Sequence, residues 1–383
     1  MIITEYSLVE ICKICSGKRL PKGCDFSEVP TAYKYIRARD IKNGTIDGSG
    51  LAYISEEVQS KIKKYIVNTN DIVITIVGAS VGDVAYVTSE FDGMNLTENA
   101  VRLTEFAPYV NSKYLMYILN SSEYWILMQQ IAGGAAQPKL GIYKIEAIKV
   151  QLPPKAVQDR IVDILHVYDD LIENNQKQIK LLEEAAQRLY KEWFVDLRFP
   201  GYENTPVVDG VPEGWSLTNI NAVMTFHRGY DLTKNSMIPG KYPVIGSTSI
   251  IGYHNQYKIK GPGIVTGRSG SLGEYQLIWE DYWPHNTALY VSDMKGHHVL
   301  YLYSMLQTVD FSGLNNGGAI PTLNRNTLSN IAVIEAPKAL QDEYVRIVEP
   351  LYSSIRTAKK QIKYLQETRD RLLPKLMNGE IEV

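Results

Sequence analysis

Two stretches of about 40 residues show the apolar spacing of a coiled-coil helix. Within residues 154–193, apolar positions recur at alternating steps of four and three, which is a heptad pattern. Residues 337–376 repeat this pattern at an offset of 183, and 16 of the 40 aligned pairs are identical. Neither helix can bury its stripe alone, so we expect the two to pack on each other, antiparallel because each follows its own domain. The predicted seam positions are Ile161, Leu165, Tyr168, Ile172, Asn175, Ile179, Leu182, Ala186, Leu189 and Trp193 in the first helix, and Tyr344, Val348, Leu351, Ile355, Ala358, Ile362, Leu365, Arg369, Leu372 and Leu376 in the second.

Two residues qualify this helix prediction. The polar Asn175 lies inside the seam, where a buried amide would help to fix the register of the pair. Pro350 stands where the first helix has Val167, and proline inside a helix removes a hydrogen bond. We therefore expect the second long helix to begin at Pro350, in its first turn. The alternative that each helix lies only on its own domain stays open.

The remaining segments consist of short β-rich runs broken by Gly, Asn and Pro, and they repeat more weakly. ENAVRL (98–103) parallels HNTALYV (285–291), which pairs Asn99 with Asn286, and YLMYIL (114–119) parallels YLYSML (301–306). The predicted fold class is α+β, with two similar domains and an antiparallel two-helix coiled coil. The predicted boundaries are 1–153 for the first domain, 154–195 for the central helix, 196–336 for the second domain, which opens with a linker at 199–215, and 337–383 for the C-terminal helix.

Composition excludes several classes of protein. Of the 383 residues, 45% are hydrophobic and 21% are charged, which is typical of a globular protein and not of a disordered chain. We expect neither a membrane span nor a secretory leader. Three cysteines cannot all pair internally, which favours reduced thiols and a cytoplasmic location. The net charge is −2, and the four predicted segments carry 0, −2, −2 and +2, so any DNA-binding face must be local.

Patterns of catalytic chemistry are scarce in the sequence. It contains no phosphate-binding P-loop, no HExxH and no tetrapeptide of the amino-methyltransferases. Cys12 and Cys15 form a CxxC, but no histidine lies near them, so buried thiols are favoured over zinc. Asp40 and Asp293 each begin a bare DxK, which is weak evidence for a nuclease. We expect no catalytic residues, no metal and no cofactor.

Polar loop residues that occur once in each domain are the candidates for contacting DNA. Arg and Lys can bind guanine edges, Asn and Gln adenine edges, and Ser or backbone amides phosphates. Residues that read different bases should differ between the two copies, so the paired Asn99 and Asn286 could equally be structural, and Arg268 is a better candidate reader than Asn286. The candidate DNA-binding residues are Arg37, Arg39, Lys42, Asn43, Ser80, Gln137 and Lys139 in the first domain, and Arg228, Tyr230, Arg268, Ser269, Ser271, Asn315, Asn316, Thr322, Asn324 and Arg325 in the second.

Several motifs resemble the specificity subunit of type I restriction–modification systems. They are QLPPKAVQDRIVDIL, LYKEWFVDLRFPG, VPEGW and the ending LLPKLMNGEI. The resemblance implies two target recognition domains, each reading one half of a split site in double-stranded DNA, held apart by a coiled coil of the central and C-terminal conserved regions. It also implies two methyltransferase partner subunits, restriction–translocase subunits that join through them, and no catalytic residues. It identifies no base-reading side chains.

The predicted helix length is compatible with a spacer between two half-sites. Residues 158–193 would span ~54 Å as a helix, whereas one turn of DNA is ~34–36 Å. We expect the coiled coil to set the spacer. Two rival functions remain at this point, a metal-dependent DNA nuclease and a coiled-coil scaffold that does not bind DNA. The buried or exposed state of Tyr190, Trp193 and Phe194 is also open, since these residues suit either a partner surface or a core.

Overall fold

The computed structural model describes residues 3–133, 138–267, 273–309 and 330–381. By its internal contacts the chain forms two units, residues 1–173 with 363–383, and residues 174–362. Two long helices, α6 (Lys155–Tyr190) and α10 (Lys338–Met377), each contribute one half to either unit. No helix in the described part of the chain combines the length and the apolar character that crossing a membrane requires.

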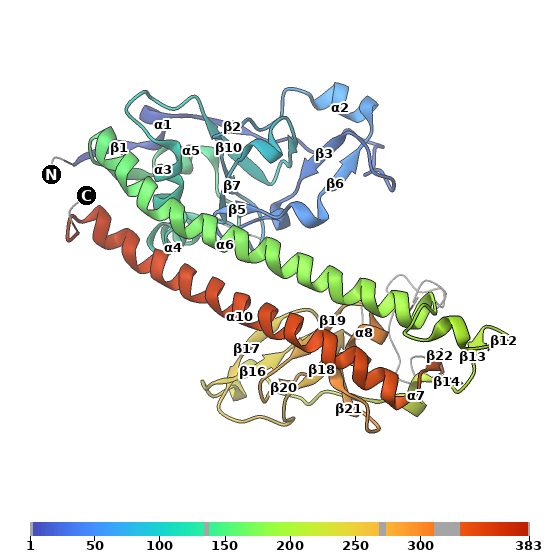
Figure 1. Ribbon diagram of the computed structural model, residues 1–383. Coiled ribbons are helices and arrows are strands. Elements are labelled where there is room, and N and C mark those ends of the chain that lie inside the picture. The colour runs from blue at the N-terminus through green and yellow to red at the C-terminus, as the bar shows by residue number, and fades with distance from the viewer. Residues whose placement is uncertain (1–2, 134–137, 268–272, 310–329, 382–383) are drawn as a thin grey trace. The chain divides into compact units, whose positions relative to one another are not determined.

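The first unit is a mixed α+β structure in which a series of short elements, beginning with a strand, precedes its half of α6 (Figure 1). Its remaining elements are β1 (Thr4–Ser7), α1 (Leu8–Ile11), β2 (Lys13–Ser16), β3 (Tyr33–Ile36), η1 (Ala38–Asp40), β4 (Ile41–Lys42), β5 (Thr45–Ile46), η2 (Gly48–Gly50), β6 (Ala52–Ile54), α2 (Glu56–Ile62), β7 (Ile72–Thr75), β8 (Val84–Tyr86), η3 (Ser89–Phe91), β9 (Asn95–Leu96), β10 (Ala100–Thr104), α3 (Ser112–Leu119), α4 (Ser122–Ile131), α5 (Ile142–Glu146) and β11 (Lys149–Leu152).

The second unit combines the elements between α6 and α10 with the adjoining half of each helix. Its elements are η4 (Lys191–Val195, π-helical), η5 (Tyr202–Asn204), β12 (Val207–Val208), β13 (Val211–Pro212), β14 (Ser216–Asn219), α7 (Ile220–Val223), β15 (Thr225–Arg228), η6 (Lys234–Ser236), β16 (Tyr242–Ile245), β17 (Ile250–His254), β18 (Gly263–Gly267), β19 (Tyr275–Ile278), β20 (Trp283–Pro284), β21 (Ala288–Asp293), α8 (Val299–Leu306) and β22 (Ala332–Glu335).

The two units share one topology. The four-stranded sheet of the first has the order β2-β10-β7-β8, and that of the second has the order β15-β21-β18-β19. Each unit adds a three-stranded sheet with one parallel pair, β6-β3-β9 and β17-β16-β20, and closes with an antiparallel pair, β1 with β11 and β14 with β22. The internal repeat predicted from the sequence is therefore a repeat of architecture, and the predicted α+β fold class is confirmed.

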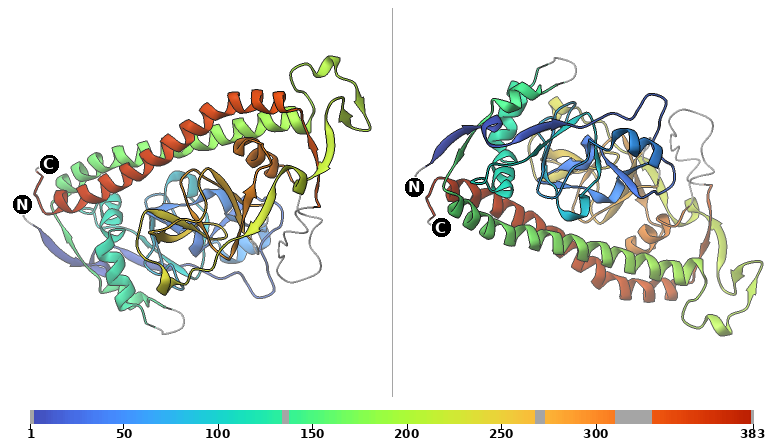
Figure 2. Two further views of the ribbon diagram at one scale, coloured as in Figure 1. Left: turned by 90° about the horizontal axis from the view of Figure 1, so that it is seen from below. Right: turned by 90° about the horizontal axis from the view of Figure 1, so that it is seen from above.

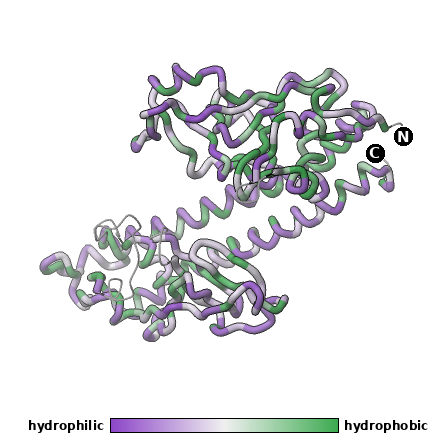
Figure 3. The backbone as a smooth tube through the Cα atoms, turned by 180° about the vertical axis from the view of Figure 1, so that it is seen from behind, coloured by the Kyte–Doolittle hydropathy of each residue, from purple (hydrophilic) through white to green (hydrophobic). Residues whose placement is uncertain are grey.

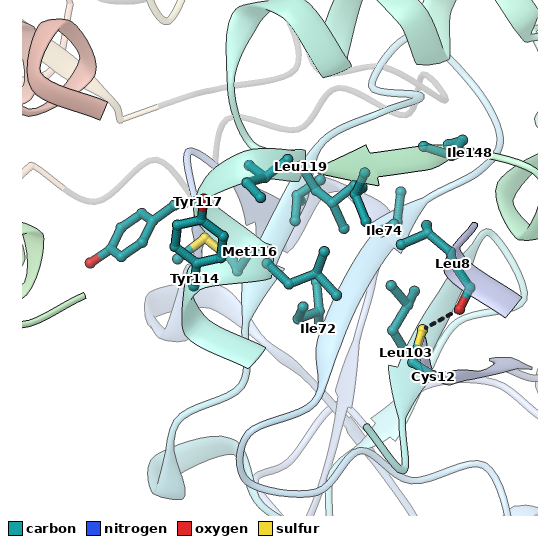
Figure 4. Packing of buried hydrophobic residues seen from close by; sticks show 14 of the residues in the cluster. Leu8, Cys12, Ile72, Ile74, Leu103, Tyr114, Met116, Tyr117, Leu119 and Ile148 are labelled. Carbon is teal, nitrogen blue, oxygen red and sulfur yellow. Dashed lines mark hydrogen bonds between the residues drawn. The ribbon is translucent and has the colours of Figure 1, made fainter. Parts of the chain in front are cut away.

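Apolar side chains between sheet and helices form the core of the first unit. Figure 4 shows part of this cluster, with Ile72 and Ile74 of β7 against α3 residues such as Leu119. The Sγ atom of Cys12 donates a 3.3 Å hydrogen bond to the carbonyl oxygen of Leu8. All three cysteines are free thiols, and Cys12 is buried.

Within each unit the halves of α6 and α10 lie side by side and run antiparallel, as both views of Figure 2 show. In the second unit Lys359 Nζ lies 3.2 Å from Glu183 Oε1 and Tyr344 donates to the carbonyl oxygen of Ala186. Hydrophobic and hydrophilic residues alternate along both helices (Figure 3), as a heptad seam requires. The predicted seam is buried at Ile161 and Tyr344, among other positions, so the predicted pairing is confirmed.

The prediction that the second long helix begins at Pro350 is wrong. The helix α10 starts at Lys338 and continues through Pro350. One missing backbone hydrogen bond is tolerated there because Val348 and Tyr352, on either side, are buried in the core. The Ser354 hydroxyl donates a 3.0 Å bond to the carbonyl oxygen of Pro350.

Gln158 of α6 and Gln341 of α10, which are equivalent in the repeat, each hydrogen-bond their helix to its own unit. Gln158 is buried, its Oε1 accepts from the backbone N–H of Asn111 at 2.9 Å, and its Nε2 donates to the Pro153 carbonyl at 2.8 Å. Gln341 is also buried and donates to the Ala336 carbonyl at 2.8 Å. A buried amide left without partners would cost about 1–3 kcal/mol, so this pair acts as an anchor.

The three aromatic residues at the end of the first long helix are core residues. Tyr190, Trp193 and Phe194 are all buried in the second unit. The ring of Phe194 lies 5.3 Å from those of both Tyr301 and Tyr344, centroid to centroid. Their interpretation as a partner surface is therefore wrong, because their packing inside the unit leaves no face to present.

Candidate nucleic-acid interface

The predicted reader Arg37 is bound within its own turn. The buried carboxylate of Asp40 accepts from the Arg37 backbone N–H at 2.8 Å, from its Nε at 3.0 Å and from its Nη2 at 3.1 Å. The same guanidinium also donates to the Gly50 carbonyl. Asp40 thus has both oxygens occupied by an arginine, an arrangement that neutralises a carboxylate and does not suit a metal ligand. The contact of Arg37 with DNA stays a prediction.

The neighbouring candidates Arg39, Lys42 and Asn43 are exposed. Lys42 Nζ lies 3.0 Å from Asp47 Oδ2. Hydrogen bonds from Ser49 and Lys42 lower the pKa of Asp47 to about 2. Asn43 has a left-handed backbone with φ of 53° and forms, with Gly44, the turn between β4 and β5. Asparagine tolerates this left-handed conformation, so the turn itself favours Asn43 whether or not the residue contacts DNA.

The structure brings the Ser80 loop and the Lys139 segment together. Val77 and Lys139 form a β-bridge, and the Gly78 N–H donates to the Pro138 carbonyl at 3.1 Å. Lys139 is exposed and Ser80 is half-buried. Residues from two distant parts of the sequence thus form one polar edge of the first unit, which the sequence alone did not predict.

In the second unit, Arg228 and Tyr230 flank Gly229. Arg228 is exposed and its Nε donates to the Asn286 carbonyl at 3.3 Å. Tyr230 is half-buried, with its hydroxyl 3.0 Å from that of Tyr290. The Lys258 ammonium lies 5.7 Å from the centre of the Tyr230 ring. Nine further candidates lie outside the described residues: Gln137, Arg268, Ser269, Ser271, Asn315, Asn316, Thr322, Asn324 and Arg325.

Sequence reasoning missed the segment Gly17–Lys18–Arg19 of the first unit, which is structurally equivalent to Gly229–Tyr230–Asp231 of the second unit. The Gly17 N–H donates to the Ala100 carbonyl at 3.0 Å, and the Gly229 N–H donates to the Ala288 carbonyl at 3.0 Å. A Cβ on Gly17 would lie 2.0 Å from the carbonyl oxygen of Thr97. A Cβ on Gly229 would lie 2.1 Å from that of His285. Only glycine fits either place, and a lone shared glycine between SGKR and RGYD is too weak a signal to find by alignment.

These backbone contacts also correct the pairing of Asn99 with Asn286. Because Ala100 is equivalent to Ala288 and Thr97 to His285, the two loops align without a gap. Asn286 then corresponds to Glu98, and Asn99 to Thr287. The sequence alignment slipped by one residue because it matched the two asparagines, so the pairing of Asn99 with Asn286 is wrong, and with it goes the recurrence that favoured a structural role for Asn286.

In the described parts of the chain, no group of three or more His, Cys, Asp or Glu side chains is arranged so that it could hold a metal ion. The second DxK aspartate, Asp293, lies on the surface with Lys295 Nζ 2.8 Å from its Oδ2. Hydrogen bonds from Lys295 lower the pKa of Asp293. The aspartates of both DxK matches are therefore bound in local ion pairs, Asp40 with Arg37 and Asp293 with Lys295.

The fold defines a class of protein with two similar α+β units and an antiparallel pair of long helices. The family model for the type I restriction modification DNA specificity domain matches residues 3–184 and again residues 212–367. The chain therefore belongs to the family of type I restriction–modification specificity proteins.

Similar proteins agree with this assignment. The type I restriction enzyme MjaIX specificity subunit of Methanocaldococcus jannaschii is 27% identical over 304 residues, which are 72% of this chain and 70% of that protein. The HindI specificity subunit of Haemophilus influenzae is 22% identical over 98% of this chain and 99% of its own length. The crystal structure of a type I S subunit from M. genitalium aligns with a TM-score of 0.52 at 18% identity, over 98% of this chain and 96% of that chain, and so shares the fold.

Proposed function

We propose that this chain is the DNA-recognition subunit of a type I restriction–modification complex, and that each α+β unit reads one half of a bipartite site. The observation that carries this proposal is the repeated topology, because two copies of one architecture suit two separate stretches of duplex. The target recognition domains would comprise residues 1–153 and 196–336, and the conserved helices residues 154–195 and 337–383.

Methylation mapping of host DNA tests this function. With the gene and its methyltransferase partner present, we expect a methylated motif made of two short specific parts separated by unspecified bases. Deleting the gene should remove that motif and no other. A methylated motif that survives the deletion, or one with a single uninterrupted part, would contradict the proposal.

We infer that the chain supplies no catalytic group and binds two methyltransferase subunits, which in turn bind the restriction–translocase subunits. In support, one exposed isoleucine recurs near the starts of α6 and α10. Ile164 and Ile347, separated by the repeat offset of 183, are 37% and 40% exposed. An exposed isoleucine that recurs at one place in each helix suits two copies of one partner, because an exposed apolar side chain contributes nothing to the core.

Repeated ion pairs lie beside these isoleucines. Lys155 Nζ is 2.9 Å from Asp159 Oδ1, and Lys338 Nζ is 2.9 Å from Asp342 Oδ1. Surface pairs of this kind contribute little to stability, which leaves recognition as a reason for their recurrence.

Substitution of the exposed isoleucines tests this partner surface. Ile164→Asp and Ile347→Asp should each release one methyltransferase subunit, and the double variant should release both, as measured by native mass spectrometry of the complex. Leu181→Asp, at an exposed apolar residue elsewhere on α6, is the control and should keep both subunits. Full assembly of the double variant would refute this surface.

The helix pair would set the spacer between the two half-sites. The helix α6 has 36 residues and α10 has 40, so α6 is ~54 Å long at ~1.5 Å per residue. Removing one heptad, ~10 Å, from both helices keeps the seam in phase, and it should shorten the preferred spacer or abolish binding. If the helices do not set the spacer, footprints on DNA with varied spacers should show the same preferred spacer length for the shortened variant as for the wild type.

A further inference from the structure

Each unit carries a glycine-anchored tip with the same backbone hydrogen bonds. After Gly17, the Lys18 N–H donates to the Leu96 carbonyl at 2.8 Å. After Gly229, the Tyr230 N–H donates to the Pro284 carbonyl, also at 2.8 Å. The second residue after each glycine, Arg19 or Asp231, therefore occupies an equivalent place.

At each tip this residue pairs with a side chain of the facing loop. Arg19 Nε donates to Glu98 Oε1 at 2.6 Å. In the second unit the Asn286 amide donates to the Asp231 carboxylate. Glu98 and Asn286 are equivalent in the register of the two loops, so the same two positions interact in both units, with the donor and the acceptor exchanged.

Stability does not account for these side chains. Arg19 is 78% exposed and Glu98 29% exposed, and an exposed ion pair contributes about 0–1 kcal/mol. The glycines and the backbone bonds, which shape the tip, are the same in both units. Only the chemistry displayed on that frame differs, as expected of two readers with different target bases.

Cations beside each tip suit the phosphates of a bound duplex. The Lys18 ammonium lies 5.6 Å from the centre of the Tyr65 ring, and Lys63 and Lys64, which precede Tyr65, are exposed. In the second unit Lys258 lies 4.8 Å from the centre of the Trp283 ring. These lysines give local positive charge to a chain whose net charge is −2.

We propose that Arg19 with Glu98, and Asp231 with Asn286, are specificity-determining contacts to base edges, one pair for each half-site. The inference rests on the proposed function. Arg19 has the chemistry to bind a guanine edge and Glu98 a cytosine amino group, whereas Asn286 suits adenine and Asp231 suits cytosine. Each intramolecular pair holds its side chains in place until the bases replace it.

The test maps methylated motifs for the full chain with its methyltransferase partner. Arg19→Gln and Glu98→Gln should relax one or two base positions in one half of the motif, and leave the other half unchanged. Asp231→Asn and Asn286→Asp should do the reverse. Binding of the complex to duplexes with single-base changes should show discrimination reduced by about 5- to 150-fold at the same positions.

Matched controls come from exposed ion pairs at the other ends of the same strands. Lys13 Nζ lies 2.9 Å from Glu105 Oε1, and Lys295 Nζ lies 2.8 Å from Asp293 Oδ2. Lys13→Gln and Asp293→Asn should keep the wild-type motif. Thermal unfolding of every variant verifies that the fold is retained.

Four outcomes are decisive. A motif relaxed in one half supports the inference. An unchanged motif overturns it, and so does a uniform loss of methylation without any change in base preference, because the side chains would then contact only phosphates. The absence of any chain-dependent motif with the wild type would instead refute the proposed function.

Discussion

The two units hold the long helices by different chemistry at equivalent places. In the first unit the junction is charged: Asp169 of α6 lies with its Oδ1 2.8 Å from Arg369 Nη1 of α10 and accepts from the Tyr117 hydroxyl of α3. By the repeat offset, Asp169 corresponds to Tyr352 and Arg369 to Ala186, and both of these are buried.

The corresponding junction of the second unit is aromatic. The Tyr344 hydroxyl lies 2.8 Å from Ser304 Oγ, with which it forms a hydrogen bond, and its ring lies 5.5 Å from that of Tyr190. Tyr190 and Trp193 stand where the first unit has Leu373 and Leu376. One topology thus accepts either an ion pair or a cluster of rings, because what the fold requires at this place is filled volume and satisfied polar atoms. The difference also helps each half of α6 to recognise its proper half of α10, since a charged seam matches an aromatic one poorly.

The largest expected effect comes from breaking the aromatic junction. Tyr344→Ala should destabilise the second unit by about 3–5 kcal/mol, because a buried ring is lost and a cavity remains. Urea denaturation followed by tryptophan fluorescence measures this, since Trp193, Trp215, Trp279 and Trp283 belong to this unit. Tyr344→Phe, which removes only the hydroxyl, should cost about 1 kcal/mol. Equal losses for Ala and Phe would mean that the hydrogen bonds, and not the ring, hold the junction.

The charged junction should respond less to the loss of one partner. Arg369→Met should cost about 2–3 kcal/mol, because Asp169 then keeps a charge in a largely buried place with only the more distant Lys113 ammonium, 3.9 Å from its Oδ2, as a cation. The double variant Asp169→Leu/Arg369→Met should regain most of this loss, as apolar replacements of ion pairs often do. Amide hydrogen exchange over residues 155–173 would measure the stability of the first unit in each variant. If the double variant were less stable than the single one, the polar pair would be stabilising beyond its mutual attraction.

The repeat and the seam were predictable because they depend on periodicity, which the chain carries locally. Seam positions such as Ile161 and Tyr344 follow from the spacing of apolar residues alone. The passage of α10 through Pro350 does not, because tertiary burial of the flanking residues overrides the local preference of proline.

The candidate site was harder to predict for a related reason. Arg37 had the right chemistry for DNA, but its binding to Asp40 depends on a turn that the sequence does not specify. Arg19 was missed because the equivalence of Gly17 and Gly229 lies in their hydrogen bonds and in the space around them. Contacts across loops are set by register, and a slip of one residue was enough to pair Asn286 with the wrong partner.

Alkaline pH should lower the stability of the aromatic junction by a smaller amount. Burial raises the pKa of Tyr301 to about 12, against about 10 for a free tyrosine. Below pH 10 the phenol is neutral in both the folded and the unfolded chain, so its contribution to stability is intact. Between pH 10 and 12 the unfolded chain releases a proton that the folded chain keeps, so stability falls as pH rises.

A tyrosine-to-phenylalanine variant isolates this effect. At pH 11 the wild type should lose about 1 kcal/mol more of its unfolding free energy, relative to pH 8, than Tyr301→Phe does. Urea titrations at the two pH values give both differences. Identical losses would show that other groups carry the alkaline sensitivity.

The smallest expected effect is the separation of two unfolding signals, one from each unit, recorded in the same sample. Burial raises the pKa of the Cys12 thiol to about 12, so at pH 8 it should stay unlabelled by a thiol reagent until the first unit opens. Tryptophan fluorescence reports mainly on the second unit, so the two signals can be recorded along the same urea series. Arg369→Met should move Cys12 labelling to lower urea and leave the fluorescence midpoint in place, whereas Tyr344→Ala should do the opposite. If either substitution shifted both signals equally, the two units would unfold as one cooperative structure, and the difference between their junctions would be one of composition without separate energetic consequence.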